Sequence, residues 1–578
     1  MVNKPAGFGR ISTDLERRTL LQGLGSAGIL ALSGSSVGSG EQATTLSGDT
    51  FDPLEATVQE IRAAITSDRA TAREITEQFL ARIDAYEDTI NAIITVNEDA
   101  VDRADELDAA YEESGPVGPL HGVPLVLKDN IDAEGLPTTA GALALEESFP
   151  PDDAFITSQL REAGCIVIGK ANLDEFAGGP DGWSSLGKQT RNPYGVDRVP
   201  GGSSAGPGAG IATSYGVIGV GTDTGGSVVN PAAYSSLVGI RPTIGLLSRD
   251  GIVPVDLSQD TAGPLTRTVT DAALALDAMQ GFDSADPVTA RGASALDDDE
   301  RYTDFLDADG LDGTRIGVVR AAFGAADNAG ESPVASQEEA EAQATEVTDV
   351  IESAIQDMEQ AGAEFVDPVD ISDIEALYEG AEAPSSYKTY LNDYLESLGD
   401  DAPYNTVEEL AASNGYSCSD AGSLREAAEA EEQPNLTESD EYKRAIGGKV
   451  ALRDATQELL AEKDLDLLLY PTRSRAPPKI GEDSDRIRQG FPLSPLAGLP
   501  AISIPAGYTE DEELPVGVEL LGLEFEEPLL IEAAYAYEQA TMQRQVPDGF
   551  GPIPGDPPEV PNPDFSLPIA TDGCPESD

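Results

Sequence analysis

Short apolar runs divided by glycine and proline begin near Gly115, and they constrain the fold more than any other feature of the chain. Runs 123–127 and 166–168 are typical of buried strands, and the amphipathic stretch 154–163 between them is typical of a helix. Further strands are expected at 217–220, 315–319, 465–470, 501–505 and 516–521, followed by a closing helix at 526–539. Strands that alternate with helices predict an α/β core.

The segment before these runs has a different texture. Apolar side chains recur at spacings of three and four along residues 54–113, which predicts that this whole segment is helical. Thr71 followed by Glu74 is a capping-box pattern, so a helix is expected to begin just after Thr71. Residues 370–460 are predicted to be mostly helical as well, with a polar interruption at 398–436.

The charge balance is extreme, with 105 acidic residues against 35 basic ones and a formal net charge of −70. Such repulsion destabilises a compact state unless salt screens it, so the composition is typical of a halophilic protein. A surface of this sign repels phosphate, which argues against nucleic acid as a partner. The three cysteines form no CxxC pair, which argues against a zinc ribbon; a disulfide between Cys418 and Cys574 stays open.

The N-terminus resembles a twin-arginine export signal. Arg17-Arg18 precedes a mildly apolar, glycine-bearing stretch that is too short to span a membrane. The pattern predicts transient contact with the export machinery and an extracellular or cell-surface location. The alternative is an ordinary amphipathic helix at the N-terminus, which would leave the protein in the cytoplasm.

Two glycine-rich loops, 201–206 (GGSSAG) and 221–227 (GTDTGGS), each contain a serine, and Lys128 ends one of the apolar runs. The carboxyl end of a strand is where α/β folds place their sites, and a buried lysine can become a neutral base. Glycine N–H groups beside Ser227 could stabilise an oxyanion, although a loop of this kind is also typical of a flexible turn. A Ser-His-Asp triad would depend on His121, the single histidine of the chain.

Further motifs accompany these loops. They are Pro119–Pro124 with Lys128-Asp129-Asn130, Gly169–Phe176, Arg191–Tyr194, Gly239–Thr243, Gly245–Ser248 and Ser258–Pro264. On these motifs the chain resembles the amidase signature family over roughly residues 54–545. Runs 248–254 and 534–539 resemble the bacterial branch that includes the peptide amidases. The resemblance implies one α/β domain at 51–545, a mixed β-sheet core covered by helices on both faces. A signal and linker (1–50) would precede it, and an extended acidic, proline-rich tail (546–578) would follow.

The resemblance also implies roles for individual residues, without a cofactor or metal. Lys128 would be the base, Ser203 a bridging serine held by a cis peptide, and Ser227 the nucleophile. The N–H groups of Thr224, Gly225, Gly226 and Ser227 would bind the oxyanion, and Ser204 would support the loop. His121 would be structural. The chain departs from many members at Val229, where they carry arginine, and at Ala205 and Pro207 of the first loop.

The expected activity is hydrolysis of a carboxamide to a carboxylate and ammonia through an acyl-enzyme, on a small-molecule or peptide amide. One alternative is the A subunit of a tRNA-dependent amidotransferase, which shares the fold and triad but needs a cytoplasmic partner complex. A second alternative is a secreted binding protein on a scaffold that has lost its activity. Substrate identity and oligomeric state stay open.

Overall fold

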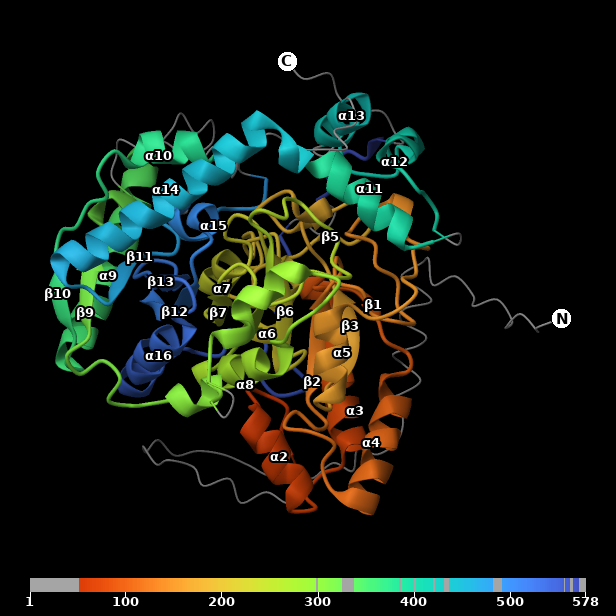
Figure 1. Cartoon of the computed structure of the whole chain (residues 1–578). Coiled ribbons are helices and arrows are strands. Elements are labelled where there is room, and N and C mark those ends of the chain that lie inside the picture. Colours follow the sequence, from red (N-terminus) through yellow and green to blue (C-terminus); the bar gives the residue numbers. More distant parts are fainter. Residues whose placement is uncertain are drawn as a thin grey trace.

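A computed structural model describes residues 51–297, 300–324, 337–383, 386–399, 402–418, 421–430, 436–481, 491–555, 557–561 and 565–570 (Figure 1). Within these ranges one mixed eleven-stranded sheet has the order β1-β3-β2-β6-β8-β7-β12-β13-β11-β9-β10. Its strands are β1 (Ile93–Val96), β2 (Pro124–Lys128), β3 (Ile166–Ala171), β6 (Ile218–Asp223), β7 (Val238–Arg241), β8 (Thr261–Thr266), β9 (Arg315–Val318), β10 (Glu364–Val366), β11 (Leu467–Pro471), β12 (Ala501–Tyr508) and β13 (Pro515–Leu521). The expected mixed sheet is confirmed.

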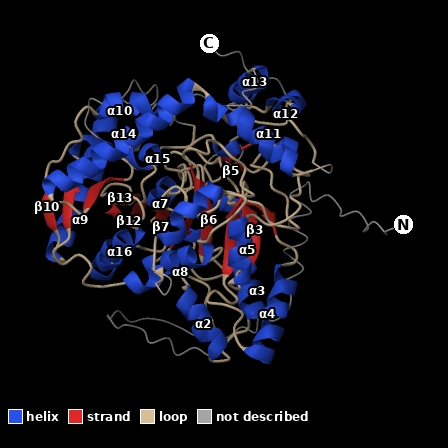
Figure 2. Ribbon diagram, in the orientation of Figure 1, coloured by secondary structure: helices blue, strands red, loops and turns tan. Residues whose placement is uncertain are grey.

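Helices surround the sheet (Figure 2). The helices are α2 (Val58–Thr66), α3 (Ala72–Ile90), α4 (Ala100–Ser114), α5 (Phe155–Glu162), α6 (Ala205–Ala212), α7 (Val229–Tyr234), α8 (Val269–Met279), α9 (Gln337–Gln360), α10 (Ile374–Ala381), α11 (Tyr387–Ser397), α12 (Val407–Ser413), α13 (Ala421–Glu429), α14 (Asp440–Lys463), α15 (Leu493–Ala497) and α16 (Glu527–Thr541). Among the described residues, no helix is both long and apolar enough to cross a membrane.

One face of the sheet carries the short helices α6 and α7. The neighbouring residues Leu265, Gly239, Ser503 and Glu519 are paired across four adjacent strands, so their side chains point to the same face. That face is the one under α7, because a Cβ at Gly239 would lie 2.6 Å from the Cβ of Ala232. Glycine therefore lets the helix that follows the second serine loop pack directly on the strands.

Strands β2 and β6 are parallel neighbours, with Leu127 opposite Val220. Parallel strands end at the same edge of a sheet, so Lys128 at the end of β2 lies beside the loop that follows β6. The first serine loop leads directly into α6, which packs on these same strands. The fold thus gathers the three predicted catalytic segments at one place.

Two predictions for the N-terminal part have different outcomes. Thr71 caps α3, and the capping box with Glu74 is confirmed, since the Thr71 side chain accepts from the Glu74 N–H and the Glu74 side chain accepts from the Thr71 N–H. The prediction that 54–113 is entirely helical is wrong, because Ile93–Val96 forms strand β1, antiparallel to β3. A four-residue strand has too few positions for alternation to stand out between two long helices.

The ends of the chain lie partly outside the described residues. The predicted export signal and linker at 1–50 lie there entirely, as does Cys574. Cys418 is disulfide-bonded and Cys165 is free and buried. The tail packs on the domain at Phe550, which is fully buried and stacks edge-on against Tyr86.

The net charge leads to a testable expectation about salt. We expect the melting temperature to rise by about 10 °C or more when NaCl is raised from about 0.1 M to about 2 M, because screening weakens the repulsion of a −70 chain. Thermal unfolding at constant pH measures it. A neutral osmolyte at matched osmolality serves as the control, since it strengthens burial without screening charge. A melting temperature that responds equally to both would contradict the expectation.

Candidate active site

Lys128 ends β2 with its side chain completely buried. Its Nζ donates to Ser203 Oγ at 2.8 Å and lies 2.8 Å from Thr222 Oγ1 and 3.3 Å from the Thr222 carbonyl oxygen. Asn130 Nδ2 donates to the same Thr222 hydroxyl at 3.0 Å, which fixes that oxygen in place. Lys128 is therefore held by two hydroxyls and a carbonyl, and none of the ion pairs in the described part of the chain involves it.

Burial lowers the pKa of Lys128 to about 7, although the carboxyl groups of Asp174, Asp223 and Asp260 act in the opposite direction. Burial also raises the pKa of Asp174 to about 8, so this neighbour is largely uncharged at neutral pH. The next strand offers a contrast, because its buried Lys170 forms an ion pair with Asp129 at 3.1 Å. Of these two buried lysines, Lys128 is the one suited to act as a neutral base.

The first serine loop is fixed by its backbone. The Gly202-Ser203 peptide bond is cis, as the resemblance implied, and the Ser203 carbonyl accepts from the Asp174 N–H at 3.2 Å. Ser204 ties the two loops together. Its N–H donates to the Ser227 carbonyl at 3.2 Å, and its hydroxyl lies 3.2 Å from the Thr222 carbonyl and 3.3 Å from the Thr222 N–H. These contacts suit the supporting role expected of Ser204.

The second serine loop is organised around Asp223, at the end of β6. Its carboxylate accepts from the Gly226 and Val228 N–H groups, both at 2.7 Å. The Gly226 N–H, expected to bind an oxyanion, is thus engaged by Asp223 in this structure. In the described residues the N–H groups of Gly225 and Ser227 have no acceptor, and both residues reach the surface of the loop. These two N–H groups can therefore donate to a ligand without breaking an existing hydrogen bond.

Side chains of Arg241, Gln259 and Asp260 hold the second serine loop in place. Arg241 forms a fully buried ion pair with Asp223 at 2.6 Å and also donates to its carbonyl. The Thr224 hydroxyl donates to Asp260 Oδ1 at 2.6 Å, and Gln259 Nε2 donates to the Thr224 carbonyl at 3.0 Å. The Thr224 side chain and carbonyl are therefore anchored, while its N–H keeps no partner among the described residues.

A cavity of about 410 Å³ opens above Ser227. Gly202, Thr224, Gly225, Gly226 and Val229 line it on the side of the serine loops. The rest of the lining, called the wall below, includes Arg241, Thr472, Arg473, Phe491, Pro492, Ser494 and Glu519. Lys128 and Ser203 are completely buried and do not line the cavity, whereas Ser227 lines it and is half-buried. A substrate would therefore meet Ser227 first.

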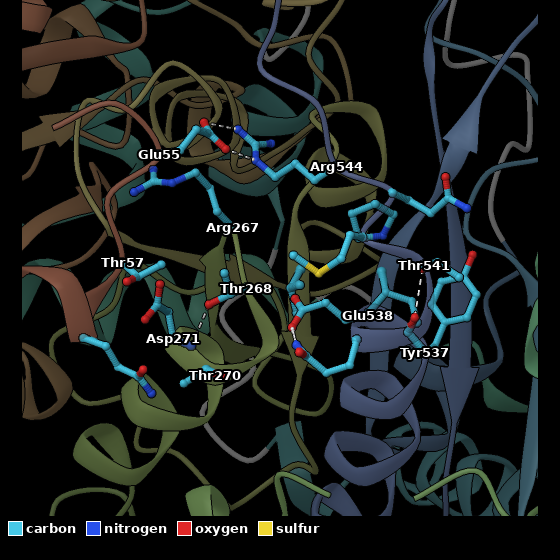
Figure 3. Close-up of a pocket in the computed structure, with 17 residues that line it drawn as sticks. Glu55, Thr57, Arg267, Thr268, Thr270, Asp271, Tyr537, Glu538, Thr541 and Arg544 are labelled. Atoms are coloured by element: carbon cyan, nitrogen blue, oxygen red, sulfur yellow. Dashed lines mark hydrogen bonds and ion pairs between the residues drawn. The ribbon is translucent and has the colours of Figure 1, made fainter. Parts of the chain in front are cut away.

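His121, the single histidine, and a second cavity both lie apart from this site. His121 packs against Tyr111, with ring centroids 5.5 Å apart, and lines neither of the two cavities described here. A second cavity of about 260 Å³ lies between α2, α8 and α16 (Figure 3). Two of its lining residues, Arg544 and Glu55, form an ion pair through two hydrogen bonds of 2.7 and 2.8 Å. None of the predicted catalytic residues lines this second cavity.

Sequence reasoning assigned no role to several residues that shape the site. Thr222 and Asp223 lie in the second serine loop and Asp174 lies in the motif Gly169–Phe176. The sequence therefore pointed to these residues but could not predict their contacts. Glu519 and Arg473 lie outside those motifs. Glu519 had one signal, because it is a lone acid in the apolar strand 516–521.

The Arg241–Asp223 pair gives a prediction about stability. We expect Arg241→Met to lower the free energy of unfolding by about 3 kcal/mol, because it leaves a buried carboxylate without its cation. Denaturant titration measures the change. Arg103→Met is the matched control, since it breaks an exposed pair with Glu106 and should cost less than about 1 kcal/mol. Equal decreases in the free energy of unfolding would mean that the buried ion pair stabilises the protein no more than the exposed one does.

Comparison with known proteins places these features in context. The Amidase family model matches residues 74–531. A probable amidase from Arabidopsis thaliana is 32% identical over 89% of this chain and 94% of its own length. The A subunit of glutamyl-tRNA(Gln) amidotransferase from Alkaliphilus metalliredigens is 34% identical over 84% of this chain and 96% of its own. The crystal structure of native peptide amidase from Stenotrophomonas maltophilia superposes with a TM-score of 0.72 at 35% identity, covering 85% of this chain and 98% of that one.

Proposed function

The chain belongs to the Amidase family, and we propose on this premise that it hydrolyses a carboxamide to a carboxylate and ammonia through Ser227, Ser203 and Lys128. The observation that carries the proposal is the contact of a buried, unpaired lysine with Ser203 Oγ at 2.8 Å, beside the loop of Ser227. A lysine in this state can accept a proton at neutral pH.

In the proposed acylation, Ser227 Oγ forms a bond to the amide carbonyl carbon. Its proton passes to Ser203 Oγ while the Ser203 proton passes to Lys128 Nζ, so each oxygen keeps its valence. In the described part of the chain, Ser227 Oγ and Ser203 Oγ do not form a hydrogen bond with each other. Catalytic hydrogen bonds of this kind often form only when substrate is bound. The proton then returns along the same route to the leaving nitrogen, which departs as ammonia.

The charge that develops on the carbonyl oxygen needs donors in fixed positions. The N–H groups of Gly225 and Ser227 are proposed for this role, with the Thr224 N–H beside them. Asp223 keeps the loop in shape by binding the Gly226 and Val228 N–H groups. Water then attacks the acyl-enzyme, activated by the same lysine, and the carboxylate leaves. This scheme uses no cofactor.

Covalent labelling tests whether the scaffold is active. A fluorophosphonate probe should label Ser227 stoichiometrically, with the modified peptide identified by mass spectrometry, because a base-activated serine attacks phosphorus. Ser203→Ala should slow labelling strongly by interrupting the proton route. If wild-type protein resists the probe while well folded, the alternative of a binding protein that has lost its activity is favoured.

A second candidate is supported by similarity to the A subunit of glutamyl-tRNA(Gln) amidotransferase. The two candidates differ in what they require. An independent amidase releases ammonia from simple amides as an isolated chain, whereas a component of an amidotransferase would depend on partner proteins and a charged tRNA. Ammonia release by the purified chain alone, unchanged on adding those components, would favour the first.

Export by the twin-arginine route is proposed from Arg17-Arg18. Replacing both arginines by lysine should retain the protein inside the cell, whereas the native chain should be recovered from the medium or cell surface. The same distribution for both forms would overturn this assignment.

A further inference from the structure

Glu519 is a buried acid in the wall of the cavity above Ser227. It lies on β13 between apolar neighbours, and only 3% of its surface is exposed. The Tyr470 hydroxyl donates to Glu519 Oε1 at 2.8 Å. Its second oxygen, Oε2, hydrogen-bonds to no described residue, and Glu519 lines the cavity. The proposed mechanism gives this carboxyl group no part.

Arg473 stands in the same wall and is also incompletely satisfied. Arg473 is half-buried, and its guanidinium lies over the Tyr234 ring, 5.4 Å from the centroid. The guanidinium also forms a side-chain hydrogen bond with Tyr234, but the buried Nε has no hydrogen-bond partner. None of the ion pairs in the described ranges involves Arg473. By contrast, the other arginine of this wall, Arg241, is already bound to Asp223.

Burial and the neighbouring charged groups set the pKa of Glu519. Burial raises the pKa of Glu519 to about 8; the charge of Asp223 acts in the same direction, while the Tyr470 hydroxyl, Arg241 and Arg473 act against it. Glu519 is therefore largely a neutral carboxylic acid at pH 7. A neutral acid that already accepts from Tyr470 offers an O–H donor through its other oxygen. Glu519 and Arg473 therefore give the wall two donors.

We propose that Glu519 is a specificity-determining residue that, with Arg473, binds an acceptor oxygen in the acyl part of the substrate. The substrates that fit are amides whose acyl part carries a second carbonyl, such as N-acylated amino acid amides. A substrate without that oxygen leaves the buried donor of Glu519 and the half-buried donor of Arg473 without this partner, and an unpaired buried donor gives strong discrimination. The inference rests on the proposed amidase function, because it concerns substrates of the same site.

Two amides that differ only in the acetamido group test the inference. They are N-acetylphenylalaninamide and 3-phenylpropanamide, and ammonia release gives kcat/KM for each. Wild-type enzyme should prefer the first by about tenfold or more at pH 7, and Glu519→Leu should reduce that ratio to about threefold or less. The ratio cancels the titration of Lys128, because both substrates use the same base. An equal loss on both substrates in Glu519→Leu would show a merely structural role and overturn the inference.

A second variant keeps the test decisive if Glu519→Leu does not fold. Glutamine retains an N–H donor at every pH, so Glu519→Gln should keep the preference and make it independent of pH. In the wild type the preference should fall above about pH 8, where Glu519 ionises and repels the acceptor oxygen. Glu527→Gln is the matched control, because Glu527 is equally buried on α16 but does not line the cavity. A preference that still falls with pH in Glu519→Gln would overturn the inference.

Failure of the inference and failure of the proposed function look different. If wild-type enzyme hydrolyses both amides equally, Glu519 does not select substrates and the amidase assignment stands. If neither amide nor any other carboxamide is hydrolysed and Ser227 is not labelled, the proposed function itself fails.

Discussion

Ser227→Ala is expected to abolish ammonia release, with kcat falling by about 10⁴-fold or more while KM changes little. The reason is that Ser227 is the only hydroxyl of the proposed relay that is half-buried at the cavity, whereas Ser203 and Lys128 are completely buried and do not line it. Losing a covalent nucleophile removes an interaction made with the reacting carbon itself. Initial rates of ammonia release at saturating amide measure the change.

The control must show that the loop survives. Ser227→Ala leaves the backbone contacts of the loop in place, because the Ser227 carbonyl still accepts from Ser204 and the Gly226 N–H still donates to Asp223. The melting temperature should therefore stay within a few degrees of wild type. Ser184→Ala, which removes a hydroxyl bonded to Asn172 away from the cavity, should retain most activity. Substantial turnover by Ser227→Ala would remove Ser227 from the mechanism.

Sequence reasoning could predict the fold where local pattern and long-range packing agree. The runs at 123–127, 166–168 and 516–521 form strands β2, β3 and β13, because strands buried on both faces have mostly apolar sequence. Thr71 capped its helix because capping depends on residues three positions apart. Strand β8, by contrast, has the sequence TAGPLT, where glycine and proline conceal strand character. Its place between β6 and β7 is set by partners distant in the chain.

For the site, the sequence indicated which residues to examine but not how they meet. The glycine loops and Lys128 were visible as motifs, and their convergence follows from the adjacency of β2 and β6. The binding of the Gly226 N–H by Asp223 could not be read from spacing, because it depends on how the loop turns back on its own strand. Glu519 and Arg473 come to the same cavity only through the pairing of β11, β12 and β13.

Lys128→Met should lower kcat by about 10³-fold or more at pH 7, because no other neutral base contacts Ser203 among the described residues. The wild-type pH profile gives the sign of the effect. Burial has lowered the pKa of Lys128 to about 7, so its neutral form predominates above that pH and its protonated form below it. Activity should therefore rise from about pH 6 to about pH 8 and then level off. In Lys128→Met the sigmoidal rise near pH 7 should disappear, and any residual rate should instead increase with hydroxide concentration without levelling off.

Lys170→Met is the matched control, because Lys170 is an equally buried lysine on the neighbouring strand but is paired with Asp129. Its loss should destabilise the fold by leaving Asp129 without a cation, yet the folded fraction should keep the wild-type pH dependence. A difference between the two variants in pH profile, rather than in stability, separates a base from a structural cation. If Lys128→Met kept the rise near pH 7, the titrating group would be another residue, and Asp174, with a pKa of about 8, would be the next to examine.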